Sequence, residues 1–331
     1  MFVHGARPYG VAAAWGWGTG VGILTKLFQR GPSKEEQVQP RIPEALRQSI
    51  LQSLGLKSVP IMPGAAQKAF SLSTNPNAEA RDYIEVLEVD EGLSARVLKI
   101  ANSVFYDRGG GSRTIIDAVN VVGTTELKNL LNATVLASLF PVRHYLRAEL
   151  WTHNIAVALT ARLVAQSLYP HRADQAFLAG LMHDVGKLLM LQQHLETYER
   201  VVKKGLAEGL ESVAAEVRTY PFAHTHVGQM IAEKWNFSED LHAAIGDHHM
   251  PWGDIEKGSL AALVKLSDLI AHSDGLGAGR DSGAWKKIYA PLLEDAWAFH
   301  DVPVREQRRL ISEASREFDS EFQMYESWGK S

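Results

Sequence analysis

Apolar positions recur at helical spacing along almost the whole chain from Pro43 onward. No run alternates between apolar and polar residues for long enough to predict a strand. Glycine and proline separate many of the apolar runs, as is typical of helix boundaries. The pattern therefore predicts an all-α fold, with helices over about 45–54, 63–73, 79–89, 91–101, 115–122, 124–139, 152–168, 173–191, 194–208, 210–219, 223–235, 238–249, 258–273, 285–300 and 303–323.

The first 42 residues do not follow this pattern. Five glycines from Gly10 to Gly22 interrupt the early apolar stretch, and residues 29–43 are polar with three prolines. We expect residues 1–42 to be a disordered leader and linker; in an alternative interpretation, translation starts near Val21. No segment reaches the ~18 apolar residues that a membrane helix needs. We therefore expect no stable membrane insertion and a cytoplasmic protein.

The string LAGLMHDVGKLLML, residues 178–191, places ionisable side chains in an apolar helix. His183 and Asp184 are adjacent, and Lys187 follows one turn later on the same face. Ala176 and Gly180 continue this face, where small side chains would leave room for bound atoms. Burying such charged groups is costly unless each is compensated, which a divalent cation would do. In an alternative interpretation, His183 and Asp184 form a buried hydrogen bond and Lys187 reaches water.

Composition narrows the kind of metal site. The 331-residue chain contains 13 histidines and no cysteine, so any metal must be held by nitrogen and oxygen atoms. Further candidate ligands stand near predicted helix ends or on apolar helices: His153 at the start of a helix, His224, the pair His248–His249, and Asp268. These groups can converge in a helical bundle and hold iron, manganese, nickel, zinc or magnesium, as one or two ions.

The other histidines are not expected to bind a metal. His226 is expected to point away from His224 and lie at the surface. Polar or loop-like surroundings predict exposed side chains for His144, His171, His194, His242, His272 and His300. The tryptophans are expected in the core or facing a partner. The net charge of −4 and a single basic cluster, Arg305–Arg309, predict no nucleic-acid binding.

Several strings resemble the HDOD domain, a relative of the HD metal-dependent phosphohydrolases that is found in bacterial signal-transduction proteins. The helix with Leu93, Arg96, Val97, Leu98, Ala101, Asn102 and Ser103 and the segment IIDAVNVVGTTELKNLL resemble its first half. Its second half is similar to WTHNIAVA, FLAGLMHDVGKLLM, FAHTHVGQMIAEKW and AIGDHHMP, in that order.

The resemblance implies an organisation of the chain. The HDOD domain would cover residues 55–255, with an N-terminal helical subdomain (55–145) and a multi-helix HD-like bundle (146–255). Residues 256–331 would be a C-terminal helical extension that completes the HD-like core.

The resemblance also implies a ligand set. The metal-binding positions of the superfamily fall, in order, on His153, His183, Asp184, His224, His248 and Asp268. In the related HD-GYP phosphodiesterases, a further ligand and a phosphate-contacting lysine would correspond to His249 and Lys187. However, HHMPWGDIEKG lacks the Gly-Tyr-Pro signature expected for cyclic-di-GMP hydrolysis.

Two functions compete at this stage. The first is a regulator that binds a signalling protein partner or a nucleotide ligand, with a retained metal site and without enzymatic activity. The second is a metal-dependent phosphodiesterase or phosphohydrolase acting on a cyclic dinucleotide or another nucleotide. In that enzyme the metal would activate water, Asp184 would hold the metal, and Lys187 would neutralise charge on the phosphoryl group.

Overall fold

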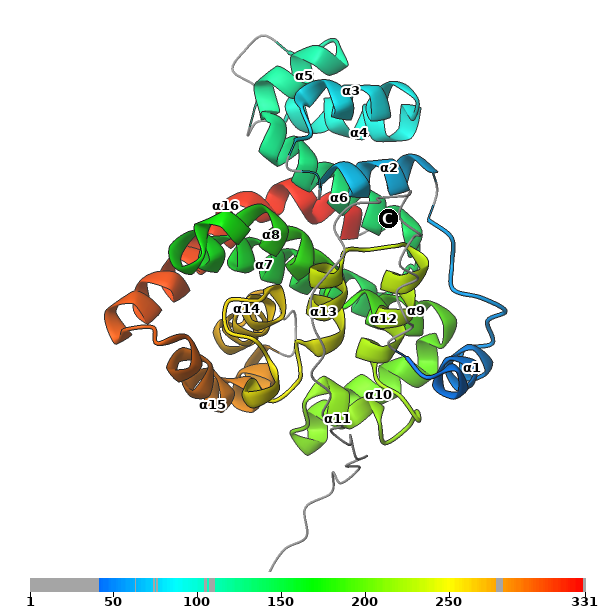
Figure 1. The fold of residues 1–331 in the computed structure, drawn as a ribbon, viewed down its shortest axis with the longest axis vertical. Coiled ribbons are helices and arrows are strands. Elements are labelled where there is room, and N and C mark those ends of the chain that lie inside the picture. Colours follow the sequence, from blue (N-terminus) through cyan, green and yellow to red (C-terminus); the bar gives the residue numbers. More distant parts are fainter. Residues whose placement is uncertain are drawn as a thin grey trace, which may run out of the picture. The chain divides into compact units, whose positions relative to one another are not determined.

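The computed structural model describes residues 42–329, except 63, 74, 76, 104–105, 107–110 and 278–281 (Figure 1). Every regular element in the described residues is a helix, which confirms the predicted all-α class. The leader and linker predicted for 1–42 lie outside the described residues except for Ile42. None of the helices in the described part is long and apolar enough to cross a membrane.

Six helices form the N-terminal part of the described chain. Side chains cap two of them: Asp90 accepts a hydrogen bond from the backbone of Leu93 (2.9 Å), and Thr114 exchanges hydrogen bonds with Asp117. Helix α6 packs against α2, α4 and α5. The six are α1 (Glu44–Ser53), α2 (Gly64–Ser73), α3 (Ala80–Glu88), α4 (Glu91–Ala101), α5 (Ile115–Val122) and α6 (Thr124–Leu139).

The following helices surround the HD string. Helix α7 packs along α8, α14 and α16, and α12 packs against both α9 and α13. Their bounds are α7 (Tyr145–Leu168), α8 (Ala173–Met182), α9 (Val185–Gln193), α10 (Leu195–Glu208), α11 (Ser212–Glu216), α12 (His224–Lys234), α13 (Glu239–Asp247) and α14 (Leu260–Asp274), with short 3₁₀ turns at Pro170–Arg172 and Trp252–Asp254.

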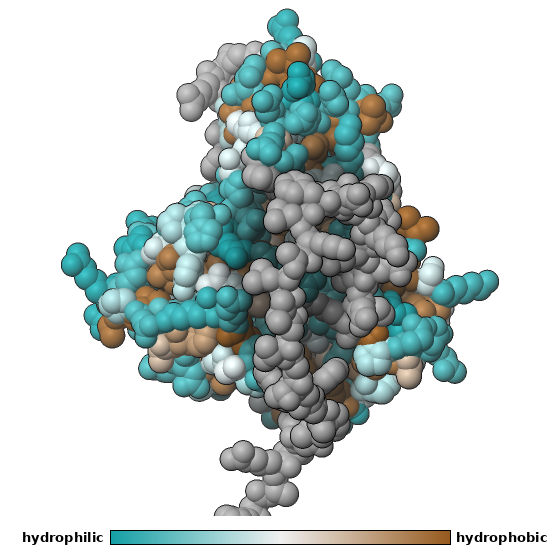
Figure 2. All heavy atoms as spheres, in the orientation of Figure 1, coloured by the Kyte–Doolittle hydropathy of each residue, from teal (hydrophilic) through white to brown (hydrophobic). Residues whose placement is uncertain are grey.

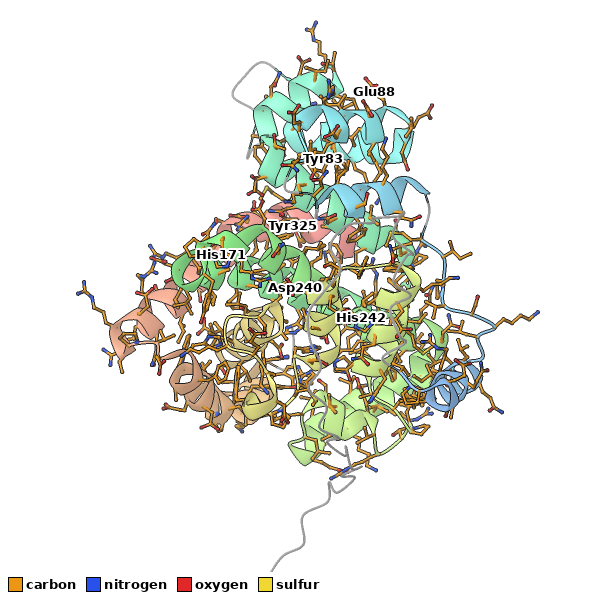
Figure 3. All side chains as sticks on the ribbon, viewed as in Figure 1. Tyr83, Glu88, His171, Asp240, His242 and Tyr325 are labelled. Carbon is orange, nitrogen blue, oxygen red and sulfur yellow. The ribbon has the colours of Figure 1, made fainter. Side chains whose placement is uncertain are left out.

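Two long helices close the chain, α15 (Ser282–His300) and α16 (Val304–Gly329). Helix α15 packs on α14, and α16 packs on α7. The indole N–H of Trp151 donates to the backbone oxygen of Tyr325 on α16 over 2.9 Å (Figure 3). The C-terminal residues are therefore part of the same core as the HD helices.

Helix α7 begins seven residues earlier than predicted. Its first backbone amides are capped by His144, whose Nδ1 accepts from the backbone N–H of Leu146 (3.3 Å). Charged residues in the first turns of α7 interrupt the apolar pattern, so the sequence does not indicate where the helix begins. Arg147 is nevertheless buried and donates to the backbone oxygens of Phe140 and Ala137 at the end of α6. His153 consequently lies two turns inside α7 rather than at its start.

The single helix predicted over 173–191 is wrong, because the chain breaks at His183–Asp184 into α8 and α9. The break turns α9 so that Gly186 meets α12: a Cβ on Gly186 would lie 2.0 Å from the backbone oxygen of His224. The room expected beside Gly180 is also absent, since a Cβ there would lie 2.8 Å from Ala158 of α7. Both glycines serve close helix packing.

Two other boundaries differ from the prediction. The helix expected over 210–219 is limited to the five residues of α11, because a turn at 217–220 leads into the following loop. The last helix continues beyond 323 to Gly329, where Met324 and Tyr325 are still buried. Burial of this end against the preceding helices stabilises turns that a polar sequence does not predict.

Candidate metal centre

His153 of α7 and His183 at the end of α8 lie beside Asp268 of α14. The Oδ1 atom of Asp268 is 3.0 Å from Nε2 of His153 and 4.0 Å from Nε2 of His183. All three side chains are buried. These residues are separated along the sequence by up to 115 positions, and the contacts of α7 with α8 and α14 bring them together.

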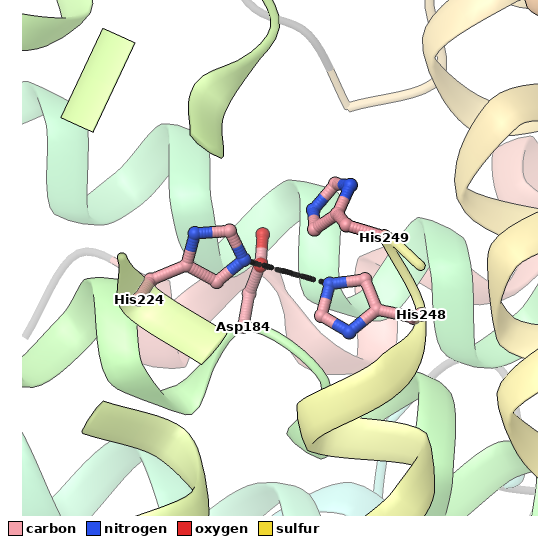
Figure 4. Close-up of side chains that lie close together, drawn as sticks. All are labelled: Asp184, His224, His248 and His249. Carbon is pink, nitrogen blue, oxygen red and sulfur yellow. Dashed lines mark hydrogen bonds and ion pairs between the residues drawn. The ribbon is translucent and has the colours of Figure 1, made fainter. Parts of the chain in front are cut away.

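A second group surrounds Asp184, which stands at the start of α9. Its Oδ1 atom is 3.2 Å from Nε2 of His224 and 3.8 Å from Nε2 of His248. The two imidazole Nε2 atoms lie 3.5 Å apart, as the dashed line in Figure 4 shows. The ring of His249 packs beside that of His248 with 4.2 Å between the ring centres.

The carboxylate of Asp184 joins these two groups. Its Oδ1 atom faces His224 and His248, whereas its Oδ2 atom is 3.2 Å from Nε2 of His183 and 3.8 Å from Nε2 of His153. All seven residues predicted as ligands therefore lie in one contiguous cluster. Their donor atoms form two sets with all atoms within 4.8 Å of each other: Asp184, His224, His248 and His249; and His153, His183 and Asp268.

The separations between donor atoms fit a shared cation. Ligands at ~2.1 Å from one ion, in tetrahedral or octahedral geometry, lie about 3.0–3.4 Å apart. The distances of 3.0 Å (His153 to Asp268) and 3.2 Å (Asp184 to His183 and to His224) fall in this range. Apart from the Lys187 ammonium beside Oδ2 of Asp184, the oxygens of Asp184 and the Nε2 atoms of His153 and His183 face only other members of the cluster among the described residues. Buried polar atoms that are so incompletely paired are costly, so the cluster is suited to a metal.

Backbone and carboxylate groups orient three of the imidazoles. Nδ1 of His183 lies 2.7 Å from the oxygen of Gly180, and Nδ1 of His248 lies 3.1 Å from the oxygens of Ala244 and Ile245. Carbonyl oxygens can only accept, so Nδ1 carries the proton in both rings. This arrangement directs Nε2 at the centre, as metal ligation requires.

Glu216 orients the third imidazole and was not predicted. Its Oε2 atom lies 2.8 Å from Nδ1 of His224 and accepts from the backbone N–H of the same residue (2.7 Å). Its other oxygen accepts from the hydroxyl of Tyr198 (2.7 Å). Burial raises the pKa of Glu216, but His224 and Lys187 outweigh it, so the pKa is lowered. The buried carboxylate thus stays ionised behind a candidate ligand.

Electrostatics keep the acidic ligands charged. Burial alone would raise the pKa of Asp184, but His183, Lys187 and His224 hold it well below the ordinary value. Burial likewise opposes ionisation of Asp268, and His272 and His153 outweigh it. Nζ of Lys187 is 2.7 Å from Oδ2 of Asp184 and 3.3 Å from the Ser212 hydroxyl, so the buried ammonium faces the centre.

The imidazoles of His248 and His249 stay neutral. Burial and the neighbouring histidines hold the pKa values of His248 and His249 well below the ordinary value. A neutral imidazole can bind a cation, whereas a protonated one cannot. Two carboxylates with neutral imidazoles thus offer a divalent ion both charge and lone pairs.

His272 was predicted to be exposed, and this is wrong. Its side chain is buried one turn after Asp268 on α14, and its Nε2 atom is 3.3 Å from Oδ1 of that aspartate. Burial lowers its pKa to about 3. The spacing of four residues from a candidate ligand was a usable signal, because it places both side chains on one helix face.

Two further histidines are also buried, contrary to prediction, and neither belongs to the cluster. His242 of α13 lies 3.9 Å from a carboxylate oxygen of Glu233, and Nε2 of His300 lies 3.3 Å from the oxygen of Ala262. His171 is exposed as expected, while the side chains of His144, His194 and His226 are half-buried. Trp235 is buried and donates to the oxygen of Pro60 (2.9 Å).

Two pockets reach the cluster. One has an empty volume of about 580 Å³ and meets the cluster at His153, Lys187 and His272; most of its other wall is apolar, with Leu146, Leu150, Val202, Leu206 and Trp285. The other has an empty volume of about 740 Å³ and a more polar wall that includes Glu211, His248, His249, Lys265, Asp268 and Asp295. The first pocket therefore reaches the candidate ligand His153, and the second reaches members of both groups, namely His248, His249 and Asp268.

Several proteins of known structure share this fold. A candidate signal transduction protein from Marinobacter aquaeolei VT8 aligns with a TM-score of 0.70 at 21% identity, over 90% of this chain and 64% of the other. A candidate phosphohydrolase from Shewanella amazonensis SB2B gives 0.62 at 21% identity, over 85% and 97%. An HDOD domain protein of unknown function from Geobacter sulfurreducens gives 0.60 at 22% identity, over 77% and 96%.

Comparison of amino-acid sequences agrees with the comparison of structures. An uncharacterized protein of Treponema pallidum (strain Nichols) is 22% identical over 227 residues, which are 66% of this chain but only 44% of that protein. The chain thus spans less than half the length of this curated relative. Residues 59–251 match the HDOD domain family, and they include six of the seven candidate ligands. With the fold, the ordered motifs and this match in agreement, the chain belongs to the HDOD family.

Proposed function

We propose that this protein is an HDOD signal-transduction regulator that carries a divalent metal centre and acts by binding a protein or small ligand. The observation that carries the proposal is the convergence of donor atoms on Asp184 and Asp268, at separations that suit shared ions. His224, His248, His249 and Asp184 would hold one ion; His153, His183 and Asp268 would hold a second, with Asp184 shared.

Exposed apolar side chains on the N-terminal helices support a protein partner. Val89 at the end of α3 is 77% exposed, and Ile116 and Val121 of α5 are 55% and 46% exposed. Helices α3 and α5 pack against each other, and hydrophobic atoms are visible among hydrophilic ones in this region of Figure 2. Burial of such exposed apolar side chains under a partner protein lowers the free energy of the complex, because apolar surface is removed from water.

Metal analysis of the purified protein tests the proposal. We expect one or two divalent ions per wild-type chain after expression in metal-replete medium, measured by inductively coupled plasma mass spectrometry. Asp184→Asn should lose both ions, because this carboxylate faces both groups. Asp240→Asn is the matched control, since this exposed carboxylate pairs with Arg172 on the surface (Figure 3). A metal-free wild-type protein would contradict the proposal.

A phosphohydrolase is the second candidate, and one observation favours it. The pocket lined by His153 and His272 ends at the Lys187 ammonium and the Ser212 hydroxyl, directly beside the candidate ligands. A divalent ion in such a centre supplies a Lewis acid to a phosphoryl oxygen. Lys187 would contribute positive charge toward a phosphate, and the apolar wall would exclude water from the rest of the ligand.

Hydrolysis assays distinguish the two candidates. A generic phosphodiester, mononucleotides and cyclic dinucleotides would be offered to the metal-loaded wild type and to Lys187→Met. Metal-dependent turnover that falls at least ~100-fold in Lys187→Met would favour the enzyme. Metal binding without turnover of any of these compounds would favour the regulator.

A further inference from the structure

The first of the two pockets, with an empty volume of about 580 Å³, has a wall made by two apolar helix faces. Leu146 and Leu150 are four residues apart on α7 and therefore share one face of that helix. Val202 and Leu206 have the same relation on α10, and Trp285 of α15 adds an aromatic ring. All of these side chains except the buried Leu146 are half-buried. An apolar group that fills the pocket would remove their exposed surface from water.

The polar groups of this pocket gather where it meets the cluster. Lys187 and Ser212 line it there, and a lysine ammonium has three N–H donors. Within the described part of the chain, two of these donors have partners, Oδ2 of Asp184 at 2.7 Å and Oγ of Ser212 at 3.3 Å. One donor is thus left for a ligand. Burial alone would lower the pKa of Lys187, but Asp184 and neighbouring groups outweigh this effect and raise the pKa, so the side chain stays a cation.

The proposed metal centre would make this end of the pocket more positive. Two divalent ions together with Lys187 carry more charge than the three buried carboxylates around them, Asp184, Asp268 and Glu216. A negatively charged group is attracted to such a site, and the surrounding apolar side chains strengthen the attraction. Glu149 also lines the pocket, and its carboxylate disfavours negative charge along the rest of the wall.

This division into a cationic end and an apolar wall narrows the class of ligand. A buried nucleobase or ribose needs hydrogen-bond partners, and the apolar faces of α7 and α10 offer none. We propose that the pocket binds an amphipathic anion, with a phosphate or carboxylate head at Lys187 and Ser212 and an aliphatic tail between α7 and α10. The inference rests on the proposed function, because it names the small ligand of the proposed regulator.

Alkyl phosphates of increasing chain length test the proposal. Inorganic phosphate and butyl, hexyl and octyl phosphate, each below its micelle concentration, would be titrated calorimetrically into the metal-loaded full chain. Affinity should rise by up to about fourfold for each methylene group that the pocket buries. Alkanoates of the same lengths identify the head group, since a longer tail should strengthen binding of whichever head the site accepts. Affinity that is independent of chain length for both heads would overturn the proposal.

The charge of the head provides a second comparison. Octyltrimethylammonium has the same tail as octyl phosphate but a positive head, which Lys187 would repel. It should bind at least ~10-fold more weakly than octyl phosphate. Equal affinities for the two compounds would show that only the tail is recognised and would overturn the proposal.

Val202→Asp and Val304→Asp form a matched pair of variants. Both replace a valine by a carboxylate, but Val202 lines the pocket, whereas Val304 at the start of α16 is 59% exposed and lies outside it. Val202→Asp should weaken the binding of octyl phosphate at least ~10-fold, and Val304→Asp should leave it unchanged. Equal affinities in the two variants would contradict the placement of the tail.

Val202→Phe fills the pocket without adding charge, and circular dichroism reports whether each variant folds. This variant should lose most of the gain in affinity between inorganic phosphate and octyl phosphate; an undiminished gain would overturn the proposal. Metal content is measured in every sample. A wild type that holds metal but shows no preference for alkyl chains refutes this inference alone, whereas a wild type without metal refutes the proposed function.

Discussion

The protein contains two buried clusters of charge that are built in opposite ways. In the first, Arg162 of α7 contacts Glu126 of α6 (3.0 Å) and both Glu321 (2.8 Å) and Glu317 of α16. In the second, Asp184, Asp268 and Glu216 stand among buried imidazoles, with Lys187 as the ammonium that faces them.

The difference lies in where the balancing cation comes from. The guanidinium of Arg162 has several N–H donors in fixed geometry and reaches all three glutamates at once. The ammonium of Lys187 reaches only one oxygen of Asp184, and no well-directed hydrogen bond in the described residues reaches the other oxygen of Asp184 or the Nε2 atoms of His153 and His183. The first cluster thus contains its own main cation, whereas we propose that the second takes up metal ions from solution.

Removing Arg162 should give the largest effect. Arg162→Met leaves three partly buried glutamates without their cation, at a position where the Arg162 side chain is only 7% exposed. Removing one partner of such a buried pair costs about 3–5 kcal/mol. Urea unfolding followed by circular dichroism should show this loss equally with and without a chelator. A loss that appears only in the presence of metal would break the distinction between the clusters.

Metal removal should have the next largest effect. Metal at 100 to 1,000 times its dissociation constant stabilises the folded chain by about 2.7–4.1 kcal/mol. Wild-type protein should therefore lose this amount in a chelator, and Asp184→Asn should show no difference between the two conditions. Thermal unfolding of both proteins with and without metal provides the measurement. An equal gain from metal in Asp184→Asn would place the ion elsewhere.

Glu321 should make the first cluster sensitive to pH. Burial raises its pKa to about 7, with Glu126 and Glu317 adding to the rise and Arg162 opposing it. A raised folded-state pKa means that stability is present below the unfolded value and is lost as pH rises through about 7. The loss between pH 5 and 8 should be about 2 kcal/mol after allowance for partial exposure.

The variant Glu321→Gln isolates this effect. It should be less dependent on pH over this interval, because the amide does not titrate, and more stable than the wild type at pH 8. Urea unfolding at both pH values gives the comparison. Parallel pH profiles for the two proteins would show that another group is responsible.

Glu216→Gln should produce the smallest effect. The amide oxygen of glutamine can still accept a hydrogen bond from Nδ1 of His224. The substitution removes the negative charge that lies 2.8 Å from this nitrogen in the wild type. Outer-sphere changes of this kind weaken metal binding by about 10-fold to 100-fold, and the conservative amide should give a value near the lower end. Isothermal titration with zinc measures this, with Glu199→Gln, which changes a half-buried carboxylate outside the cluster, as the control. Unchanged affinity would limit the role of Glu216 to packing.

The sequence predicts the helical class correctly, and the residues that it predicts as ligands lie together, for a physical reason. Apolar periodicity reports which face of a helix is buried, and ionisable residues such as His183 and Asp184 stand out on that face. The family to which the chain belongs follows from the same strings. Domain limits at 55, 145 and 255 remain predictions.

What the sequence does not reveal depends on contacts between distant segments. The break at His183–Asp184 lies among good helix formers, and the packing of Gly186 against α12 favours it. The burial of Arg147 cannot be read from the sequence, because its partners, the last carbonyls of α6, are set by tertiary packing. His272 appeared exposed because its neighbours His153 and Tyr289 come from other helices.

The dimensions of the centre are set by residues that have no side chain. Gly180 lets α8 approach α7, and Gly186 lets α9 approach α12, each closer than a methyl group permits. These two contacts act as fixed spacers between the backbones that carry His153, His183, Asp184 and His224. If either glycine were replaced by alanine during evolution, the distances between the donor atoms would change, while all seven candidate ligands would still be present in the sequence. Relatives that keep all seven candidate ligands but lose these glycines would then carry the motif without the geometry of the proposed metal centre.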